Sequence, residues 1–419
     1  MGKRPEIVDP LAPSLDASSY EGKAASLALL LAAEVAAMSV WFSSSAAIAN
    51  IKHDAAISAS HEALLTTAVQ IGFVAGTIIS ALFCIADRYD PRRLFAFSAT
   101  TAAIATGALV ALPPTGAWVV ALRFVTGICM AGIYPVGMRI AASWARRDLG
   151  LIIGLLVGAL TLGSASPHLL AATGDIDWRM IYGAASACAL LAAMLIGFVR
   201  LGPGIRRATA IDISTIAQSW LRPSLRKANI GYLGHMWELY AMWAWLTVFL
   251  HQSFAVRGFA HADAIASWVT FAAMAAGAIG CWLAGKLADN YGRTSVTIAA
   301  MTLSGGCAAL TGFLYSAPLV VLLPVILLWG ATVVADSAQF SAAIAELAEP
   351  NSVGTLLTAQ TCFGFLLTLA SIQLVPGVQG YLGWPGAFAM LAIGPLAGCV
   401  AMWRLRSDPD APRLAGGKR

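Results

Sequence analysis

Charged residues are scarce in this sequence. Asp, Glu, Lys and Arg make up only 11% of the 419 residues, whereas hydrophobic residues make up 59%, and the mean hydropathy is +0.76. A soluble globular domain has about 25% charged residues. The composition therefore excludes an ordinary soluble protein and favours one that lies in a lipid bilayer.

Several chemical signatures are also missing. The seven cysteines stand singly, without a C-x-x-C pair or a Cys/His cluster, so neither a disulfide framework nor a zinc site is indicated. The phosphate-binding pattern G-x-x-x-x-G-K-[ST] does not occur, so ATP is not a local energy source. We expect no metal, no cofactor and no enzymatic activity. The opening residues through Lys23 are polar and precede a full-length apolar run, which does not fit a cleavable signal peptide.

Long apolar runs of about twenty residues recur along the chain, each able to cross a hydrocarbon core about 30 Å thick. They are continuous and do not alternate with polar residues, which is typical of helices and not of a β-barrel. The sequence thus predicts an all-α membrane protein with twelve transmembrane helices. The runs are roughly 25–48, 63–86, 94–112, 117–142, 149–172, 180–199, 228–251, 264–285, 294–316, 319–344, 353–376 and 385–404.

The distribution of basic residues predicts the orientation. Most of the 26 Lys and Arg residues fall in segments on the side of the N-terminus, and the loops on the other side carry only Lys52, Arg179 and Arg257. Basic loops stay in the cytoplasm. We therefore expect a multi-pass protein of the cytoplasmic (inner) membrane with both termini cytoplasmic. The net charge of +5 is accounted for by this topology, and nothing indicates nucleic-acid binding.

The chain divides into two related halves. The longest break in hydrophobicity, 200–227, is a predicted cytoplasmic linker between six helices in 1–199 and six in 228–419. E-x-x-A-M-x-x-W occurs at 34–41 and again about 200 residues later, and A-D-R-Y after the second run reappears as A-D-N-Y after the eighth. Halves with an even number of helices share one topology, so we expect a pseudo-two-fold axis along the membrane normal.

A loop motif identifies a family resemblance. G-K-L-A-D-N-Y-G-R, Gly285 to Arg293, resembles the loop signature G-x-L-a-D-r-x-G-r of the major facilitator superfamily. In the first copy Phe83 and Asp90 replace the two glycines. R-F-V-T-G, which begins at Arg123, is similar to a helix-four motif of the same family. The resemblance covers the whole chain and implies a secondary transporter whose halves surround a central cavity.

The resemblance implies that these loops act as a gate latch on the cytoplasmic side. An aspartate there accepts hydrogen bonds from a helix N-terminus, and an adjacent arginine pairs with acids at other helix ends. We expect Arg293 to reach Glu346 or Glu349. The alternative is that these charges only set topology. The predicted gating residues are Asp87, Arg88, Gly285, Asp289, Gly292 and Arg293.

The repeated glutamates, Glu34 and Glu238, lie about ten residues into the first and seventh helices, near the membrane midplane. These two helices face the cavity in the family, so the repeat predicts two carboxyl groups on opposite cavity walls. A charge at that depth costs a few kcal/mol unless it is paired, which makes each group a candidate proton carrier. The alternative is a glutamate buried neutral between helices.

Four neighbours complete the predicted site. Arg123 in the fourth helix is expected within reach of Glu34. His235 shares a helix face with Glu238 and could pass it a proton. Trp245 lies on that face and is a candidate to stack on a substrate. Asp336, in the tenth helix, either guards the inner mouth of the cavity or locks to a basic loop.

These residues favour a proton-coupled secondary transporter that moves a small solute by alternating access. Its expected partners are the solute, protons and the lipid bilayer, and we expect a monomer. One alternative is an anion or organic-acid carrier that clamps its substrate with Arg123. A second is metal uptake through unclustered methionines, which are usually core residues. A third is a membrane sensor that does not transport.

Overall fold

The computed structural model describes residues 21–83, 85–145, 148–173, 176–204, 213–349 and 352–418, and the regular elements within these ranges are all helical. Ten segments of the described chain are long and apolar enough to cross a membrane. One of them, 353–406, contains two crossings, because Gly383 interrupts its helix with a φ of 66°. The 34-residue helix α11 (Pro223–Val256) completes the bundle. The twelve predicted helices are thereby confirmed.

The N-terminal half contains the first six transmembrane segments. They are α1 (Lys23–Met38) with α2 (Ser43–Asp54), α3 (Ala59–Leu82), α5 (Pro91–Ala108) with η2 (Leu109–Ala111), α6 (Ala117–Met130) with α7 (Tyr134–Ala142), α8 (Leu149–Ala171), and α9 (Trp178–Leu195) with η3 (Ile196–Phe198). The short helix α4 (Ile85–Arg88) lies in the loop that carries the first gating motif.

The C-terminal half contains the other six. They are α11, α12 (Ala262–Tyr291), α13 (Arg293–Thr311) with η4 (Gly312–Leu314), α14 (Leu319–Thr332) with α15 (Ser337–Leu347), and α16 (Val353–Leu391), whose last turns continue into α17 (Ile393–Arg406). Helix α10 (Ile213–Leu221) precedes α11, and η5 (Ala411–Gly417) follows α17.

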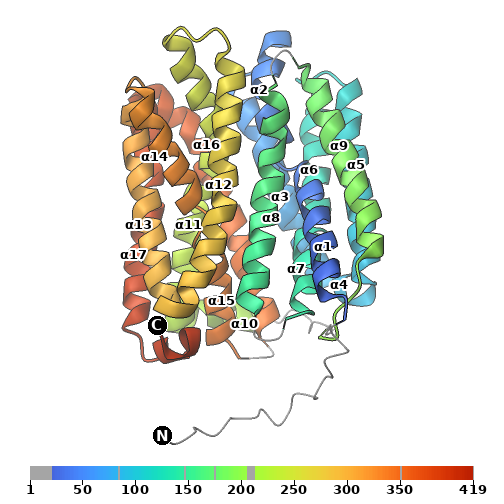
Figure 1. Ribbon diagram of the computed structural model, residues 1–419, viewed down its shortest axis with the longest axis vertical. Helices are drawn as coiled ribbons and strands as arrows, with labels where there is room; N and C mark the ends of the chain where they lie inside the picture. Colours follow the sequence, from blue (N-terminus) through green and yellow to red (C-terminus); the bar gives the residue numbers. More distant parts are fainter. Residues whose placement is uncertain are drawn as a thin grey trace, which may run out of the picture.

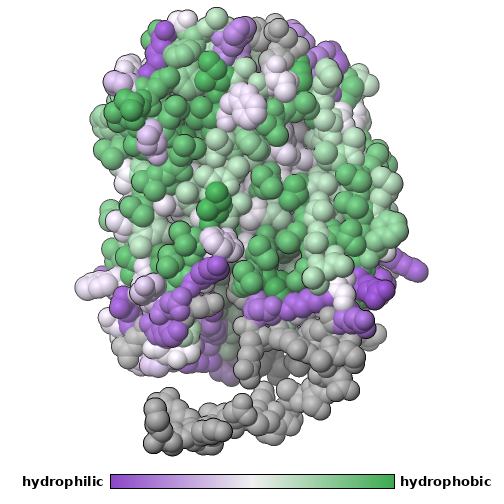
Figure 2. Space-filling view, in the orientation of Figure 1, coloured by the Kyte–Doolittle hydropathy of each residue, from purple (hydrophilic) through white to green (hydrophobic). Residues whose placement is uncertain are grey.

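The two halves stand side by side, with α8 packed along α12 and α3 along α16 (Figure 1). We call the end that carries α10 and η5 the linker end, and the opposite end the far end. Apolar residues cover most of the height of the visible face, and hydrophilic residues gather near both ends (Figure 2). A continuous apolar belt of this kind matches a bilayer, because lipid tails cannot hydrate polar groups.

Three transmembrane segments are broken near their middles. The first is interrupted at 39–42, the fourth at 131–133 and the tenth at 333–336. The fourth and tenth segments occupy equivalent places in the two halves, so this break follows the internal repeat. The first and seventh do not match, because α11 is continuous where the first segment is broken. Broken helices leave backbone groups that must find partners within the protein.

Glycines allow two helices of the N-terminal half to cross closely. A Cβ atom at Gly127 in α6 would lie 2.1 Å from the carbonyl oxygen of Val69 in α3. A Cβ atom at Gly72 in α3 would lie 2.1 Å from the carbonyl oxygen of Phe124. Both positions therefore require glycine, as expected where transmembrane helices associate through small residues.

We predict that Gly127→Ala lowers the thermal unfolding temperature of the purified protein by several degrees, because overpacking of this kind costs about 1–3 kcal/mol. Gly183→Ala in α9 is the matched control, since a Cβ atom there meets nothing within 4 Å. The measurement is tryptophan fluorescence during heating in detergent. Equal unfolding temperatures for the two variants would contradict the close approach of α3 and α6.

Candidate functional site

Glu238 is held inside the C-terminal half. Its side chain is 1% exposed. The indole Nε1–H of Trp329 in α14 donates to Oε1 at 2.7 Å, and the hydroxyl of Ser304 in α13 donates to Oε2 at 2.9 Å. Both oxygens are thus bonded by neutral donors on neighbouring helices, which reduces the cost of burying this carboxyl group.

His235 and Asp336 form a second polar contact one helical turn away. Nδ1 of His235 lies 2.8 Å from Oδ1 of Asp336, and both side chains are almost completely buried. Neither atom has a hydrogen bond of good geometry, so the contact is defined by distance alone. The imidazole also lies beside the ring of Phe340 in α15, with centroids 5.8 Å apart. Asp336 occupies the break between α14 and α15, and α11 therefore contacts this break through titratable side chains.

Glu34 has a different environment. It is completely buried in α1, and neither carboxyl oxygen has a hydrogen-bond partner among the described residues. The group lies against the backbone of α7, where a Cβ atom at Gly137 would be only 1.7 Å from Oε1. Glycine at this position therefore provides the space that the carboxyl group occupies.

Arg123 supports the break in the first transmembrane segment and does not pair with Glu34. Its guanidinium donates to the carbonyl oxygen of Val40 at 2.8 Å, to the carbonyl of Trp41, and to the hydroxyl of Ser43 at 3.1 Å. It also donates to the carbonyl oxygen of Leu65 in α3 at 3.4 Å. The predicted contact is wrong because the chain leaves the helix at 39–42 and presents free carbonyl groups to the arginine.

A small cavity lies between the two halves. Its volume is about 60 Å³, and its lining residues are Trp41, Tyr134, Met138, Val157, Leu160, Tyr232, Met236, Leu239, Tyr240, Val334, Ser337, Ser341, Thr361 and Phe365. Neither Glu34 nor Glu238 is among them. The prediction that both carboxyl groups stand on cavity walls is therefore wrong in this conformation. Helix α11 faces the cavity with Tyr232, Met236 and Tyr240, and directs Glu238 into its own half.

Aromatic rings close the cavity toward the far end. Trp41 and Phe42, in and after the first break, meet Tyr240 across the two halves, with ring centroids 6.0 and 5.9 Å apart. Hydrogen bonds between the halves lie beyond this layer. The hydroxyl of Ser45 donates to the carbonyl of Ala244 at 3.3 Å, and the amide of Gln373 donates to the hydroxyl of Thr67 at 3.0 Å.

Trp245 lies beyond the aromatic layer and not beside the cavity of 60 Å³. Its indole N–H donates to the carbonyl oxygen of Ile372 in α16 at 3.0 Å, so it joins two helices of one half. Among the described residues, no group of three or more His, Cys, Asp or Glu side chains is placed to hold a metal ion.

The predicted partner of Arg293 is confirmed. Its guanidinium donates to both oxygens of Glu346 at 2.8 and 2.6 Å, and to the amide oxygen of Gln339 at 2.8 Å. Gly292 joins α12 to α13 with a φ of 90°, a conformation that favours glycine. Gly285 has open space around its Cβ position.

The structure describes fewer side chains of the first copy of the motif. Arg88 ends α4 and is exposed, and the side chains of Asp87 and Asp289 lie outside the described part of the structure. Asp90, which replaces a motif glycine, accepts from the backbone N–H of Arg92 at 2.8 Å and caps α5. The Arg92 guanidinium also hydrogen-bonds this carboxylate and lowers the pKa of Asp90. The substitution therefore provides a helix cap.

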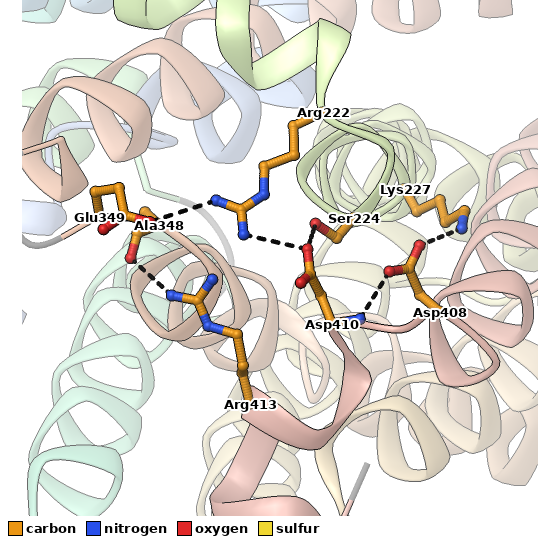
Figure 3. A network of polar contacts seen from close by, with 8 residues as sticks. All are labelled: Arg222, Ser224, Lys227, Ala348, Glu349, Asp408, Asp410 and Arg413. Atoms are coloured by element: carbon orange, nitrogen blue, oxygen red, sulfur yellow. Dashed lines mark hydrogen bonds and ion pairs between the residues drawn. The ribbon is translucent and has the colours of Figure 1, made fainter.

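The C-terminal segment docks at the linker end (Figure 3). Asp410 accepts from the hydroxyl of Ser224 at 2.6 Å and from Arg222 at 3.2 Å, both at the start of α11. Arg413 donates to the carbonyl oxygen of Ala348 after α15, at 3.3 Å. The backbone N–H of Ala415 donates to Glu346 at 3.0 Å, so the carboxylate that binds Arg293 also holds η5.

Sequence reasoning missed three members of this site. Trp329 and Ser304 bind Glu238, and Gly137 makes room for Glu34, but none of them stands in a repeated or charged motif. A signal for the break before α7 was present in the sequence. Gly132 lies in it and Pro135 follows it, and proline at the first turn commonly begins a helix.

Twelve transmembrane segments in two halves around a small central cavity are the architecture of a multi-pass membrane transporter. The profile described as Major Facilitator Superfamily matches residues 29–371. The chain belongs to this superfamily and is a secondary transporter.

Three solved structures share its fold. The nucleoside transporter NupG has 14% sequence identity and a TM-score of 0.67, covering 91% of this chain and 99% of that chain. The proton:xylose symporter XylE, bound to 6-bromo-6-deoxy-D-glucose, has 15% identity and a TM-score of 0.66, covering 91% of this chain and 96% of that chain. The human organic anion transporter MFSD10 (TETRAN) has 14% identity and a TM-score of 0.66 over 93% and 100%. Identities this low show the fold alone. No curated protein matches the sequence.

We predict that Asp410→Asn releases the C-terminal segment and accelerates trypsin cleavage after Arg413, because the amide cannot replace the charge-assisted contacts with Ser224 and Arg222. Asp177→Asn is the control, since that exposed carboxylate pairs at the far end. The hydrogen bond from Ser224 lowers the pKa of Asp410, so its contribution is present above the ordinary value of about 3.9 and is lost only as the pH falls below it. Relative to trypsin cleavage of an unstructured peptide at the same pH, wild-type cleavage should therefore be constant from about pH 6 to 8. A rate that is unchanged in the variant would contradict the docking.

Proposed function

We propose that the protein couples solute transport to protons, and that Glu34 carries the proton in the observed conformation. The supporting observation is the complete burial of both carboxyl oxygens without a hydrogen-bond partner among the described residues. Removing one charge from water without a counter-charge costs several kcal/mol. A protonated carboxyl group avoids most of that cost, so the neutral form fits this position.

Glu34 is close to an element that lines the cavity. Its carboxyl group lies against Gly137 of α7, and the same helix begins with Tyr134, which lines the cavity. If the halves separate at the cavity, water can reach the Glu34 carboxyl group by passing the first turn of α7. Hydration stabilises the charged form and releases the proton. Opening of the cavity and deprotonation of Glu34 are therefore linked.

The C-terminal half has a second ionisable group, Asp336, next to residues that line the cavity. Asp336 contacts His235 and lies between Val334 and Ser337, which both line the cavity. We propose that the His235–Asp336 pair and Glu238 respond to the same opening. Trp329 can donate to Glu238 in either protonation state, and the Ser304 hydroxyl can donate to the carboxylate or accept from the protonated acid.

The anion-carrier alternative has less support. It requires a guanidinium that faces the solute, whereas Arg123 is completely buried and bonded to three backbone carbonyl groups and Ser43. Withdrawing it would remove one donor from each of the carbonyl groups of Val40 and Trp41 in the break at 39–42. We therefore assign Arg123 a structural role.

The gate latch and the orientation remain proposals. We place the linker end in the cytoplasm, because Lys52, Arg179 and Arg257 are the basic residues of the far-end loops in the described chain. In that orientation the aromatic layer closes the external side. The pairing of Arg293 with Glu346 supports a role for the second motif in fixing the linker ends of α13 and α15.

We predict that Glu34→Gln and Glu238→Gln both fold but differ in function. In Glu34→Gln, proton-driven accumulation in liposomes should fail, while solute exchange at equal pH persists, because glutamine resembles the protonated acid. An independent readout is the infrared band of a protonated carboxyl group during a pH titration, which should disappear in Glu34→Gln.

Glu349→Gln is the control, since its carboxylate is 72% exposed. The band should remain in this variant. Accumulation at the wild-type level by the Glu34→Gln, Glu238→Gln double variant would contradict a proton-carrying role for either acid.

The orientation has its own test. In a cysteine-free background, cysteines introduced at Asp54 and Arg257 should react with an impermeant maleimide added outside intact cells. Cysteines at Glu349 and Arg404 should react only after permeabilisation, because they lie at the linker end. The reverse pattern would place the linker end outside.

A further inference from the structure

We infer that the central cavity binds an uncharged solute that contains a flat ring. The cavity lies between the two halves, and the breaks of the fourth and tenth segments meet it at Tyr134 and Ser337. Broken helices beside a central cavity mark the solute site in transporters of this architecture. The inference rests on the proposed function only in taking this cavity as the site of transport.

The wall of the cavity carries no ionised side chain. Its polar groups are hydroxyls, namely those of three tyrosines, two serines and one threonine, and the indole of Trp41. Arg123 is bonded at the first break and Glu238 within its own half, and neither Glu34 nor Asp336 is a lining residue. A charged solute here would lose its hydration without gaining a counter-charge, which costs several kcal/mol. The wall therefore selects against cations and anions.

Ring surfaces cover one side of the cavity. Trp41 and Phe365 come from opposite halves, with centroids 5.5 Å apart, and Tyr240 lies 4.9 Å from Phe365. Aromatic contacts of this kind contribute about 0.5–1.5 kcal/mol each beyond area burial. A flat solute ring can join this cluster, whereas a saturated ring of the same volume loses the stacking contribution.

A hydrogen-bond donor at this cluster is unused. The indole N–H of Trp41 is buried and has no acceptor among the described residues, although the residue lines the cavity. An unsatisfied buried donor costs about 1–3 kcal/mol, and such groups in native proteins call for an explanation. A neutral acceptor on the solute, such as an amide or ring carbonyl, would satisfy it.

The cavity must widen to receive such a solute. Its volume of about 60 Å³ is below the ~150 Å³ of a cavity that holds benzene. The lining on the linker side includes Met138 and Met236, whose flexible side chains adapt to different shapes. The cavity is therefore a contracted form of the site, and its ring cluster spans the two halves.

The test is equilibrium binding to the purified protein in nanodiscs at one pH, without a gradient. The probes are phenylacetamide, phenylacetate, phenethylamine and cyclohexylacetamide, together with indole-3-acetamide and indole-3-acetate. Isothermal calorimetry should detect the two neutral aromatic amides and not their charged analogues. Cyclohexylacetamide should bind at least threefold more weakly than phenylacetamide. Failure of both aromatic amides to bind, or tighter binding of a charged analogue, would overturn the inference.

Variants locate the site. Trp41→Phe keeps a ring but removes the donor, and should weaken amide binding about 2- to 10-fold, as expected for one hydrogen bond. Trp282→Phe is the matched control, because that indole is 42% exposed on α12 and should leave binding unchanged. If Trp41→Phe and Trp282→Phe bind the amide with equal affinity, the amide does not bind at Trp41.

These measurements are independent of proton coupling. Binding of neutral aromatic amides together with intact proton-driven accumulation in Glu34→Gln would uphold the solute class and refute the coupling proposal. Binding of charged analogues, with accumulation abolished in Glu34→Gln, would refute the solute class and uphold the coupling proposal.

Discussion

The buried guanidinium of Arg123 is the interaction on which the centre of the molecule depends. Where the first transmembrane segment leaves the helical conformation, water is not available to satisfy its carbonyl groups, and Arg123 provides several donors from one side chain. The turn that it stabilises brings Trp41 to the cavity and Phe42 to the opposite half. A lysine would offer one ammonium group and could not span carbonyls of both the break at 39–42 and α3 in the same way.

In both halves a side chain of one transmembrane segment contacts the break in another segment, but the segments involved are not equivalent. In the N-terminal half the fourth segment holds the break of the first, through Arg123. In the C-terminal half the unbroken seventh segment contacts the break of the tenth through His235, and binds Trp329 just before it through Glu238. Glu34, Glu238 and the His235–Asp336 pair are therefore not among the residues that line the cavity.

The fold was predictable because bilayer thickness fixes the length of each segment, and the charge pair Arg293–Glu346 because both residues lie at helix ends near one surface. The directions of the side chains could not be predicted. Helix α11 is buried on nearly all sides, so its apolar pattern cannot distinguish the face of Tyr232 and Met236 from that of His235 and Glu238. The contact of Glu34 with Arg123 was inferred from depth along straight helices, and the break at 39–42 invalidates that estimate.

The location of Arg123 also bears on the response to membrane voltage. A guanidinium retains its charge in protein interiors, and this one is buried in the membrane-spanning segment Ala117–Ala142, within the electric field across the bilayer. One elementary charge that crosses the whole field changes energy by about 2.3 kcal/mol per 100 mV. If the N-terminal half rocks and shifts Arg123 along the membrane normal, its charge crosses a fraction of this field, and the energy changes by the same fraction. The resting potential thus favours one orientation of that half, even when the solute is neutral.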